Sequence, residues 1–472
     1  MTIRYIQSKL RALRLVQESS FEADPGSGYI LARLAHDIAW APDQTKHMVE
    51  PQKSSAMRGP DGNVNGGKGG TISWKCPLNT KSLGALSTLF TPFAATDPPY
   101  DYESRAAATG TVTAGTATSI TLPTSASHIV GRPIIHKPTR FCTFTAGSTD
   151  TCNRNSHGLV NGDIVRFCVD GGGALPTGIN SSTNYYVVNK TDNDFQISLT
   201  LGGSAINLSD VGTASQYYIR NGYGSLRWVT RVTVGAPNDV LDVNRAFAQT
   251  PASGDSVEAV SSFSPSTGPV KTFTIHAFGG QGSTDKFKLV ATGCNVTFKL
   301  ASAGPKALPE IEFSAQVSSW SYSEASLTQA TFSETSPASI LGGLLYVAGS
   351  ALATRSISFD PGMEIAEMES LDTNGRSGWN CSNSAPKVDM SLLHDTDILD
   401  KWCNNTNVTI EFNRFISFDN CWGFYIPAAQ ISKATHEDAG VLNIKPEIVA
   451  VDPGVNADSA FYLLWNFAIC GV

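Results

Sequence analysis

The chain is short of charge. Asp, Glu, Lys and Arg make up 16% of its 472 residues, against roughly 25% in typical soluble proteins. The formal net charge is −7, so tight binding to nucleic acid is not expected, because it needs a Lys/Arg excess on at least one face. Hydrophobic content of 41% is enough for packed cores and argues against disorder. A surface poor in charge but rich in Ser, Thr, Asn and Gly suits large, partly buried assembly faces.

Ordered cysteine patterns and long apolar runs are also missing. The nine cysteines include no CxxC and show no regular spacing, so reduced thiols made in a cytoplasm are expected instead of a disulfide framework. The start, MTIRYIQSKLRALRLVQ, has no apolar core of the kind a signal peptide needs. The most apolar run, Ile340 to Leu352, contains three glycines and is too short to span a bilayer. We therefore expect a soluble chain with no membrane partner.

Metal and cofactor motifs are weak. His394, Asp395, Asp397 and Asp400 could form a carboxylate/His metal cluster. At the start of a helix, however, Asp395 and Asp397 more simply satisfy N-terminal amides and the helix dipole, and Asp395 is the predicted N-cap. The Gly-rich GGKGG (66–70) lacks the strand-then-helix context and the spacing of a phosphate loop. We expect no metal and no cofactor.

Catalytic motifs are equally weak. Glu364, Glu367, Glu369 and Asp372 could act as paired acid/base carboxylates, but their alternation with Met363, Ile365 and Met368 fits the solvent face of a strand better. No G-x-S-x-G elbow exists. Trp74, Trp379, Trp422 and Trp465 could form a sugar-binding platform, although Trp in alternating β sequence is usually core. We expect no enzyme; a glycosidase would need a carboxylate pair across a cleft, which the sequence alone does not exclude.

Apolar and polar residues alternate with a period of two through much of the sequence. KFKLVATGCNVTFKL (286–300), SLRWVTRVTV (225–234) and NVTIEFNRFISF (407–418) alternate and are rich in β-branched and aromatic residues. Helical candidates are few and short, namely Ser82 to Phe90 and Asp395 to Cys403. The predicted fold class is mainly β.

Two stretches read as unequal copies of one template. Residues 57–90 and 368–403 each give a Gly/Asn-rich loop, a strand with a Trp and a Cys (Trp74 and Cys76; Trp379 and Cys381) and a short amphipathic segment. Each is followed by an aromatic strand, FTIHAF (273–278) or WGFYIP (422–427), and then by PEIEFSAQV (309–317) or LNIKPEIVA (442–450). A repeat that does not continue as an array indicates a fused pair of domains.

The middle of the chain reads as an insertion inside an insertion. Residues 108–135 and 224–260 look like the opening and closing strands of one small barrel, with Pro251 and Gly254 in a turn. Between them, residues 141–222 contain turn-forming residues typical of β-hairpins at Asn161-Gly162 and Thr191-Asp192-Asn193. The predicted domains are 1–107 with 261–335, then 108–260 as an inserted β decoration with a nested β module at about 141–222, and 336–472.

Several segments carry a family resemblance. ESSFEADPG (18–26), MRGPDGNVNGGKGGTISWKCPL (57–78), GWNCS with WGFYIPAAQI, and DAGVLNIKPEIVA (438–450) resemble the major tail tube proteins of long-tailed bacteriophages. HGLVNGDIVRF with LPTGINSSTNYYVVNKTDNDFQISL looks like an insertion module of phage tail proteins. The resemblance implies two β-sandwich/barrel domains, each with a short helix, whose sheets join neighbours around a ring. Because the chain is duplicated, three chains per ring are expected where the family has six single domains.

The resemblance also implies a function and partners. The chain would be a virion protein of the phage tail, assembled in the host cytoplasm, that polymerises into a hollow tube for DNA. The partners implied are other copies of itself, a tape measure protein, tail terminator and tip proteins, and viral DNA that passes without tight binding. An acidic lumen would let DNA slide. The alternative is a β-rich tail adhesin or carbohydrate-binding protein.

Two expectations concern surfaces. Residues 58–70 are predicted to be a mobile Gly-rich loop that reaches the next ring, with Arg58, Asp61, Asn63 and Lys68 as candidate contact residues. The insert, 108–260, is predicted to project outward, away from the lumen and the subunit interfaces.

Overall fold

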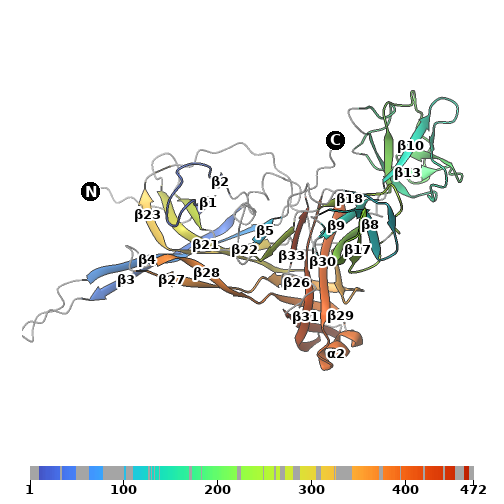
Figure 1. The fold of residues 1–472 in the computed structure, drawn as a ribbon. Coiled ribbons are helices and arrows are strands. Elements are labelled where there is room, and N and C mark those ends of the chain that lie inside the picture. Colours follow the sequence, from blue (N-terminus) through green and yellow to red (C-terminus); the bar gives the residue numbers. More distant parts are fainter. Residues whose placement is uncertain are drawn as a thin grey trace, which may run out of the picture.

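The fold is mainly β, which confirms the predicted fold class at that level (Figure 1). The computed structural model describes residues 10–31, 35–48, 63–77, 100–102, 110–125, 128, 130–131, 133–137, 139–169, 173–181, 183–220, 225–247, 249–259, 262–265, 272–279, 287–304, 310–323, 325, 343–370, 376–393, 395–417, 420–438, 442–451 and 462–466.

The strands outside the middle of the chain form two sets. The first unit contains β1 (Leu10–Gln17), β2 (Ile30–Leu31), β3 (His36–Met48), β4 (Asn63–Pro77), β20 (Phe273–Gly279), β21 (Phe287–Ala303), β22 (Glu310–Val317) and β23 (Ser319–Ser323). The second unit contains β24 (Leu344–Val347), β25 (Ser350–Leu352), β26 (Thr354–Asp360), β27 (Met363–Glu369), β28 (Arg376–Ser384), β29 (Lys387–Leu393), α2 (Thr396–Cys403), β30 (Val408–Ser417), β31 (Asn420–Asp438), β32 (Leu442–Ala450) and β33 (Tyr462–Asn466).

Long bent strands organise both units. The first half of β21 pairs with β20 and β23, whereas its second half pairs with β22 and β26. The first half of β31 likewise pairs with β30 and β33, and its second half with β32. In each unit, one long strand therefore changes partner strands along its length and links the two sets of partners. Most of the buried hydrophobic side chains of both units belong to one cluster.

The two units repeat the same pairings in the same order. In the first, β1 pairs with β20, β20 with β21, β21 with β22, β22 with β4 and β4 with β3. In the second, β24 pairs with β30, β30 with β31, β31 with β32, β32 with β29 and β29 with β26. The ribbon of β27 and β28 continues β26 and β29 in the second unit. It corresponds to the outer halves of β3 and β4, which continue the inner halves of those strands in the first unit.

Irregularities and buried positions repeat as well. The register of β20 against β21 shifts between Phe273 and Ile275, and that of β30 against β31 shifts between Val408 and Ile410. A bulge changes which side chains face the core, so bulges at matching positions keep both patterns aligned. Matching buried pairs are Leu13/Leu345, Leu15/Val347, Ile72/Val388, Trp74/Met390, Cys76/Leu392, Ile275/Ile410, Leu289/Phe424, Ile311/Ile444 and Ala315/Ile448.

This register corrects part of the repeat read from the sequence. The counterpart of Trp74 is Met390, because each lies on the strand that pairs with the last long strand of its unit. Trp379 lies on β28, which pairs only with β27 among the described strands. FTIHAF likewise matches β30 and not WGFYIP. The wrong assignment came from similar spacings of Trp and other aromatic residues in the two stretches. PEIEFSAQV and LNIKPEIVA do lie on the matching strands β22 and β32.

The Gly-rich stretch is also not a loop throughout. Residues 63–70 belong to β4, which contradicts the expectation of a mobile loop over 58–70. A Cβ at Gly70 would come within 2.5 Å of the Trp40 ring, and one at Gly69 within 2.9 Å of the Arg376 guanidinium. These glycines therefore make room for side chains that pack across the strand. Arg58 and Asp61 lie outside the described residues.

The insert has two nested parts. Its outer part is a seven-stranded sheet in the order β6-β18-β9-β16-β17-β8-β7. Its inner part is a closed six-stranded barrel in the order β10-β11-β14-β13-β12-β15, seen at the upper right of Figure 1. The strands are β6 (Gly110–Thr111), β7 (Ala114–Gly115), β8 (Ser119–Pro123), β9 (Pro133–Lys137), β10 (Thr139–Thr145), β11 (Thr151–Asn153), β12 (Ile164–Val169), β13 (Tyr185–Val188), β14 (Asp194–Ser198), β15 (Gln216–Arg220), β16 (Ser225–Thr233), β17 (Asn238–Val243) and β18 (Ser256–Ala259).

The chain enters and leaves each part of the insert at adjacent points. Two short strands, β5 (Tyr100–Tyr102) and β19 (Ser262–Pro265), flank the insert and pair with each other, and β19 also pairs with β33. At the next level, β9 and β16 flank the inner barrel and pair at His136 and Ser225. Adjacent ends let an inserted module fold without separating the strands of its host.

Helix α2 is short. The Asp395 carboxylate accepts a hydrogen bond from the backbone nitrogen of Asp397 at 2.8 Å and occupies the N-cap position. Ile398 is the buried residue of the helix. Among the described residues, no helix has the length and apolar character needed to cross a membrane. The predicted helix at Ser82 to Phe90 lies outside the described residues.

Candidate assembly site at the joint between the two units

The two units meet along a short antiparallel strand pairing. Leu300 of β21 pairs with Phe359 of β26, and Ala303 pairs with Ile357. Phe359 is 2% exposed, and its ring stacks on Phe424 with centroids 4.7 Å apart. The joint uses one edge of the first unit and a different edge of the second. It is therefore a head-to-tail contact between two related units.

A two-stranded ribbon from the second unit reinforces the joint. Arg376 of β28 donates through Nη1 to the carbonyl oxygens of Lys68, Val317 and Ser318, at 3.3, 3.2 and 3.4 Å. Trp379 is buried and donates through Nε1 to the carbonyl of Gly293 at 2.7 Å. The ribbon formed by β27 and β28 thus lies across β4 and the end of β22 (Figure 1).

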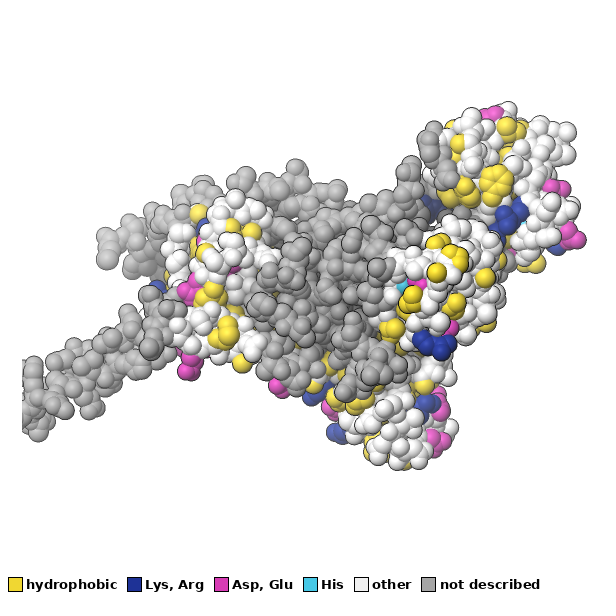
Figure 2. All heavy atoms as spheres, viewed as in Figure 1, with side chains coloured by type: hydrophobic (Ala, Val, Ile, Leu, Met, Phe, Trp, Pro, Cys, Tyr) yellow, Lys and Arg dark blue, Asp and Glu magenta, His cyan; other side chains and the backbone are white. Residues whose placement is uncertain are grey.

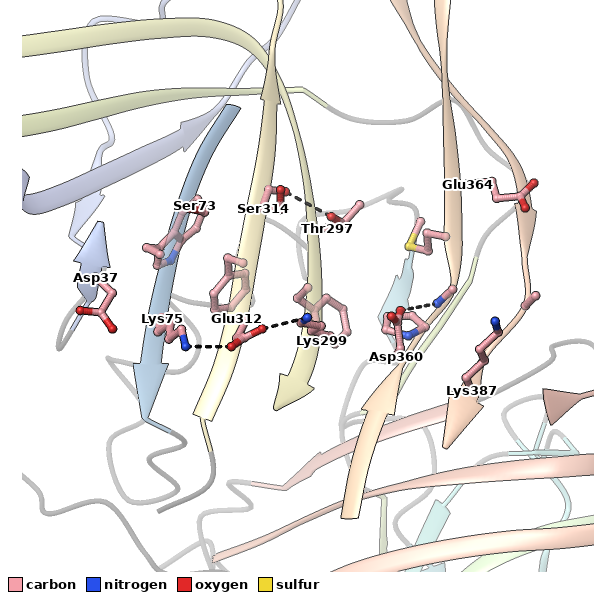
Figure 3. A pocket seen from close by; sticks show the side chains of 17 residues that line it. Asp37, Ser73, Lys75, Thr297, Lys299, Glu312, Ser314, Asp360, Glu364 and Lys387 are labelled. Atoms are coloured by element: carbon pink, nitrogen blue, oxygen red, sulfur yellow. Dashed lines mark hydrogen bonds and ion pairs between the residues drawn. The ribbon is translucent and has the colours of Figure 1, made fainter. Parts of the chain in front are cut away.

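A groove of about 690 Å³ opens beside the joint (Figure 3). On the first unit it is lined by a row of charges in which Glu312 lies between Lys75 and Lys299, with N–O distances of 2.9 and 3.0 Å. The hydrogen bond with Glu312 raises the pKa of Lys75, and the hydrogen bonds with the two lysines lower the pKa of Glu312. These charges largely satisfy each other across three neighbouring strands.

The carboxylates singled out in the sequence do not gather into one site. Glu364 lines the far side of the groove with Asp360 and Lys387. Glu367 forms an ion pair with Arg376, the residue that attaches the β27–β28 ribbon to the first unit. Glu369 is exposed at the end of β27, and Asp372 lies outside the described residues. Among the described residues, no group of three His, Cys, Asp or Glu could hold a metal ion.

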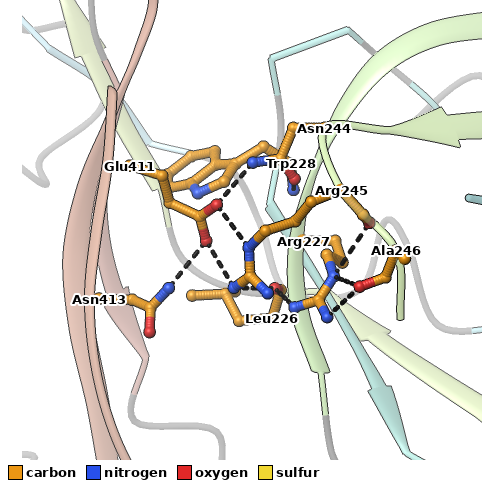
Figure 4. Close-up of polar contacts among 8 residues, drawn as sticks. All are labelled: Leu226, Arg227, Trp228, Asn244, Arg245, Ala246, Glu411 and Asn413. Atoms are coloured by element: carbon orange, nitrogen blue, oxygen red, sulfur yellow. Dashed lines mark hydrogen bonds and ion pairs between the residues drawn. The ribbon is translucent and has the colours of Figure 1, made fainter. Parts of the chain in front are cut away.

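A second contact surface fixes the insert to the second unit (Figure 4). Arg245, which follows β17, donates to both carboxylate oxygens of Glu411 on β30, through Nε at 2.8 Å and Nη2 at 2.9 Å. The same carboxylate accepts from Asn244 at 2.6 Å and from Asn413 at 2.8 Å. Trp228 stacks on Tyr425 with centroids 5.0 Å apart. We call the Arg245–Glu411 pair with these neighbours the insert anchor.

The insert anchor is buried and strongly polar. The Glu411 side chain is 2% exposed and that of Arg245 is 15% exposed. Arg227 beside it donates to the carbonyl oxygens of Arg245 and Ala246 at 3.1 and 2.9 Å, and burial, followed by the charge of Arg245, lowers the pKa of Arg227 to about 9. The sequence reading missed this site. The only available signal was charged residues inside alternating apolar strands.

A third buried polar group lies where the inner barrel leaves the outer sheet. The Nε2 atom of His136 on β9 is 2.8 Å from Asp255, which also pairs with Arg140 at the start of the barrel. Burial, together with the charges of Arg140 and Arg227, lowers the pKa of His136 to about 3. His136 is therefore neutral in the folded protein at neutral pH.

This geometry predicts a loss of stability in acid. The unfolded state takes up a proton on His136 near pH 6.5, but the folded state excludes it down to about pH 3. The stabilisation is therefore complete above pH 6.5 and declines as pH falls toward 3, at about 1.4 kcal/mol per pH unit for one proton. We expect His136→Gln to reduce the pH dependence of the unfolding free energy by the amount due to about one proton. Urea unfolding curves from pH 7 to pH 4.5 measure this dependence.

A control separates this histidine from a second one. The pKa of His276 is lowered to about 4 by burial and by the charge of Lys288, so His276→Gln should remove a further part of the slope. The two effects should add, because the residues lie in different units of the fold. An unchanged slope in the His136→Gln protein would contradict the prediction.

The remaining predicted contact residues fall on β4. Asn63 pairs with Met48 at the outer end of the β3–β4 hairpin. Lys68 lies further in, with its ammonium 5.3 Å from the centre of the Trp320 ring and its carbonyl oxygen bonded to Arg376. Six cysteines, namely Cys76, Cys142, Cys152, Cys168, Cys294 and Cys403, carry a thiol and form no disulfide. Trp74 is buried and stacks on Phe313, with centroids 5.1 Å apart.

The site is thus a set of contacts between parts of one chain, two of which share the same order of strand pairings. In comparisons with known proteins, neither a protein-family model nor a curated protein matches the sequence.

Proposed function

We propose that this chain is a structural subunit that assembles through sheet edges into rings and stacked tubes, as the resemblance to phage tail tube proteins implies. One observation carries the proposal: the two related units join head to tail, through different edges, at β21 and β26. The joint uses the β21 edge of the first unit and the β26 edge of the second. The equivalent edge of the other unit is left unused in each case. Repeating it gives either a closed ring or an open filament.

Ring size follows from the same duplication. Each chain supplies two units, so a ring of six units takes three chains. We propose a homotrimeric ring with pseudo-six-fold appearance. The low charge content of 16% supports extensive burial of surface between copies.

Surface charge is compatible with a conduit for DNA. The net charge is −7, and on the described part of the face in Figure 2 basic and acidic side chains are interspersed. Such a surface gives phosphates no continuous basic track to bind. We propose that viral DNA passes through the assembled tube without tight binding. A role in the phage tail would also bring the subunit into contact with a tape measure protein and with terminator and tip proteins.

Electron microscopy and native mass spectrometry test the proposal together. We expect negatively stained protein to form tubes or stacked rings, and we expect the smallest closed species to contain three chains. A six-chain ring would contradict the proposed stoichiometry but would remain compatible with a tube-forming subunit. Discrete monomers that bind cells or glycans would replace the proposal with a tail adhesin or carbohydrate-binding protein.

A further inference from the structure

The internal repeat identifies the two edges that the joint leaves unused. Within the chain, the second half of β21 carries β22 on one side and β26 on the other. Its counterpart, the second half of β31, carries β32 on one side and no other described strand. The counterpart of β26 is the inner half of β3, which pairs only with β4 among the described strands.

Burial at matching positions supports this assignment. Leu300 and Phe359, which pair in the joint, are 6% and 2% exposed. By the register of the repeat, their counterparts are His436 on β31 and Trp40 on β3. His436 is exposed and Trp40 is only half-buried. The positions that the joint covers within the chain thus remain accessible at the two counterpart edges.

The β3–β4 hairpin gives an independent argument. Beyond Gly70, where β22 ends, the outer part of β4 pairs with β3 and with no other described strand, as in the pair of His47 with Val64. An isolated two-stranded ribbon is only marginally stable in water, so a further strand or surface would stabilise it. The matching ribbon of the second unit, β27 with β28, is seated on the first unit through Arg376 and Trp379.

One pair of opposite charges lies on the two counterpart edges. Lys433 on β31 and Asp43 on β3 are both exposed. When the register of the intrachain joint is transferred to these edges, the two residues come opposite each other. Opposite charges facing across neighbouring strands contribute roughly 0.2–1 kcal/mol.

From these observations we infer that the second half of β31 binds the inner half of β3 of a second copy of this chain, in the register of the intrachain β21–β26 joint. The β3–β4 ribbon of that copy then lies across the second unit, as β27 and β28 lie across the first. This inference rests on the proposed function only in requiring that chains associate. It places β3 and β4 in the contact within a ring, whereas the sequence reading assigned residues 58–70 to the contact between rings.

Cysteine cross-linking tests the register. In the intrachain joint, Lys299 and Asp360 lie one position from the Leu300–Phe359 pair, and their counterparts are the exposed residues Thr435 and Ala41. The Thr435→Cys and Ala41→Cys variants are made as separate chains in a Cys403→Ser background, since Cys403 is exposed. Mixing the two proteins under mild oxidation should give disulfide-linked dimers, because directly opposite Cβ atoms lie about 4.5–5.5 Å apart.

Two controls define the outcome. His436→Cys mixed with Ala41→Cys should form at least tenfold less dimer, because adjacent strand residues point to opposite faces. Lys299→Cys with Asp360→Cys in one chain should give an internal disulfide and no dimer. Equal dimer yields from the Thr435 and His436 variants would overturn the register. Tubes seen by microscopy without any Thr435–Ala41 cross-link would overturn the inference while leaving the proposed function; no association of any kind would overturn both.

Discussion

The Glu411→Ala variant is expected to lose about 3–5 kcal/mol of stability, the usual cost of leaving one partner of a buried ion pair without its counter-charge. Arg245, which belongs to the insert and is 15% exposed, would have neither carboxylate oxygen to accept its two hydrogen bonds. Asn244 and Asn413 would also lose an acceptor. The first transition in urea, followed by tryptophan fluorescence, should shift accordingly, because Trp228 stacks beside the pair.

The double variant Glu411→Leu with Arg245→Met supplies the matched control. Replacing both charges with apolar side chains of similar volume removes the unpaired charge, and such replacements are often neutral or stabilising. We expect the double variant to recover most of the stability lost in Glu411→Ala. Equal losses in the two proteins would show that the anchor acts through packing and not through charge pairing.

The Phe359→Ala variant should cost about 3–5 kcal/mol, because it leaves a cavity where a fully buried ring lies beside the joint. Phe359 pairs with Leu300 across the joint and stacks on Phe424 of β31. Its loss weakens both the joint and the core of the second unit. Chemical unfolding should show a lower midpoint and earlier separation of the two units in limited proteolysis.

Trp40→Ala is the control that the repeat provides. Trp40 occupies the matching position on the first unit but is half-buried, so its truncation in the isolated chain should cost less than half as much. If the counterpart edge binds another copy, Trp40→Ala should impair association more than it impairs folding. A larger stability loss for Trp40→Ala than for Phe359→Ala would contradict the assignment of the two positions.

The sequence predicts the strand content well because alternation is a local signal. Residues 225–233 and 287–300 of these alternating segments lie on strands, and the short segment after Asp395 is a helix. The closing strands of the repeat were also matched correctly. The middle strands were not, because the comparison relied on Trp and Cys spacing. The structure shows that the repeat is kept in pairing order and bulge position, while Trp74 in one unit corresponds to Met390 in the other.

The contact sites could not be read from the sequence for a different reason. Glu411 and Arg245 are 166 positions apart along the chain, and nothing near either residue marks it as paired. The glycines at 69 and 70 predicted a loop because glycine is common in loops. Their actual role, room for Trp40 and Arg376, depends on residues brought close only by folding.

The pairing of His136 with Ser225 has a practical consequence. The six-stranded barrel is attached through two chain ends that leave from facing positions on adjacent antiparallel strands. Any module whose own termini lie about one strand spacing apart, roughly 5 Å, fits such a position without moving its host. We therefore expect that the barrel can be exchanged for a foreign domain, and if chains assemble as proposed, the assembly would carry that domain at regular intervals.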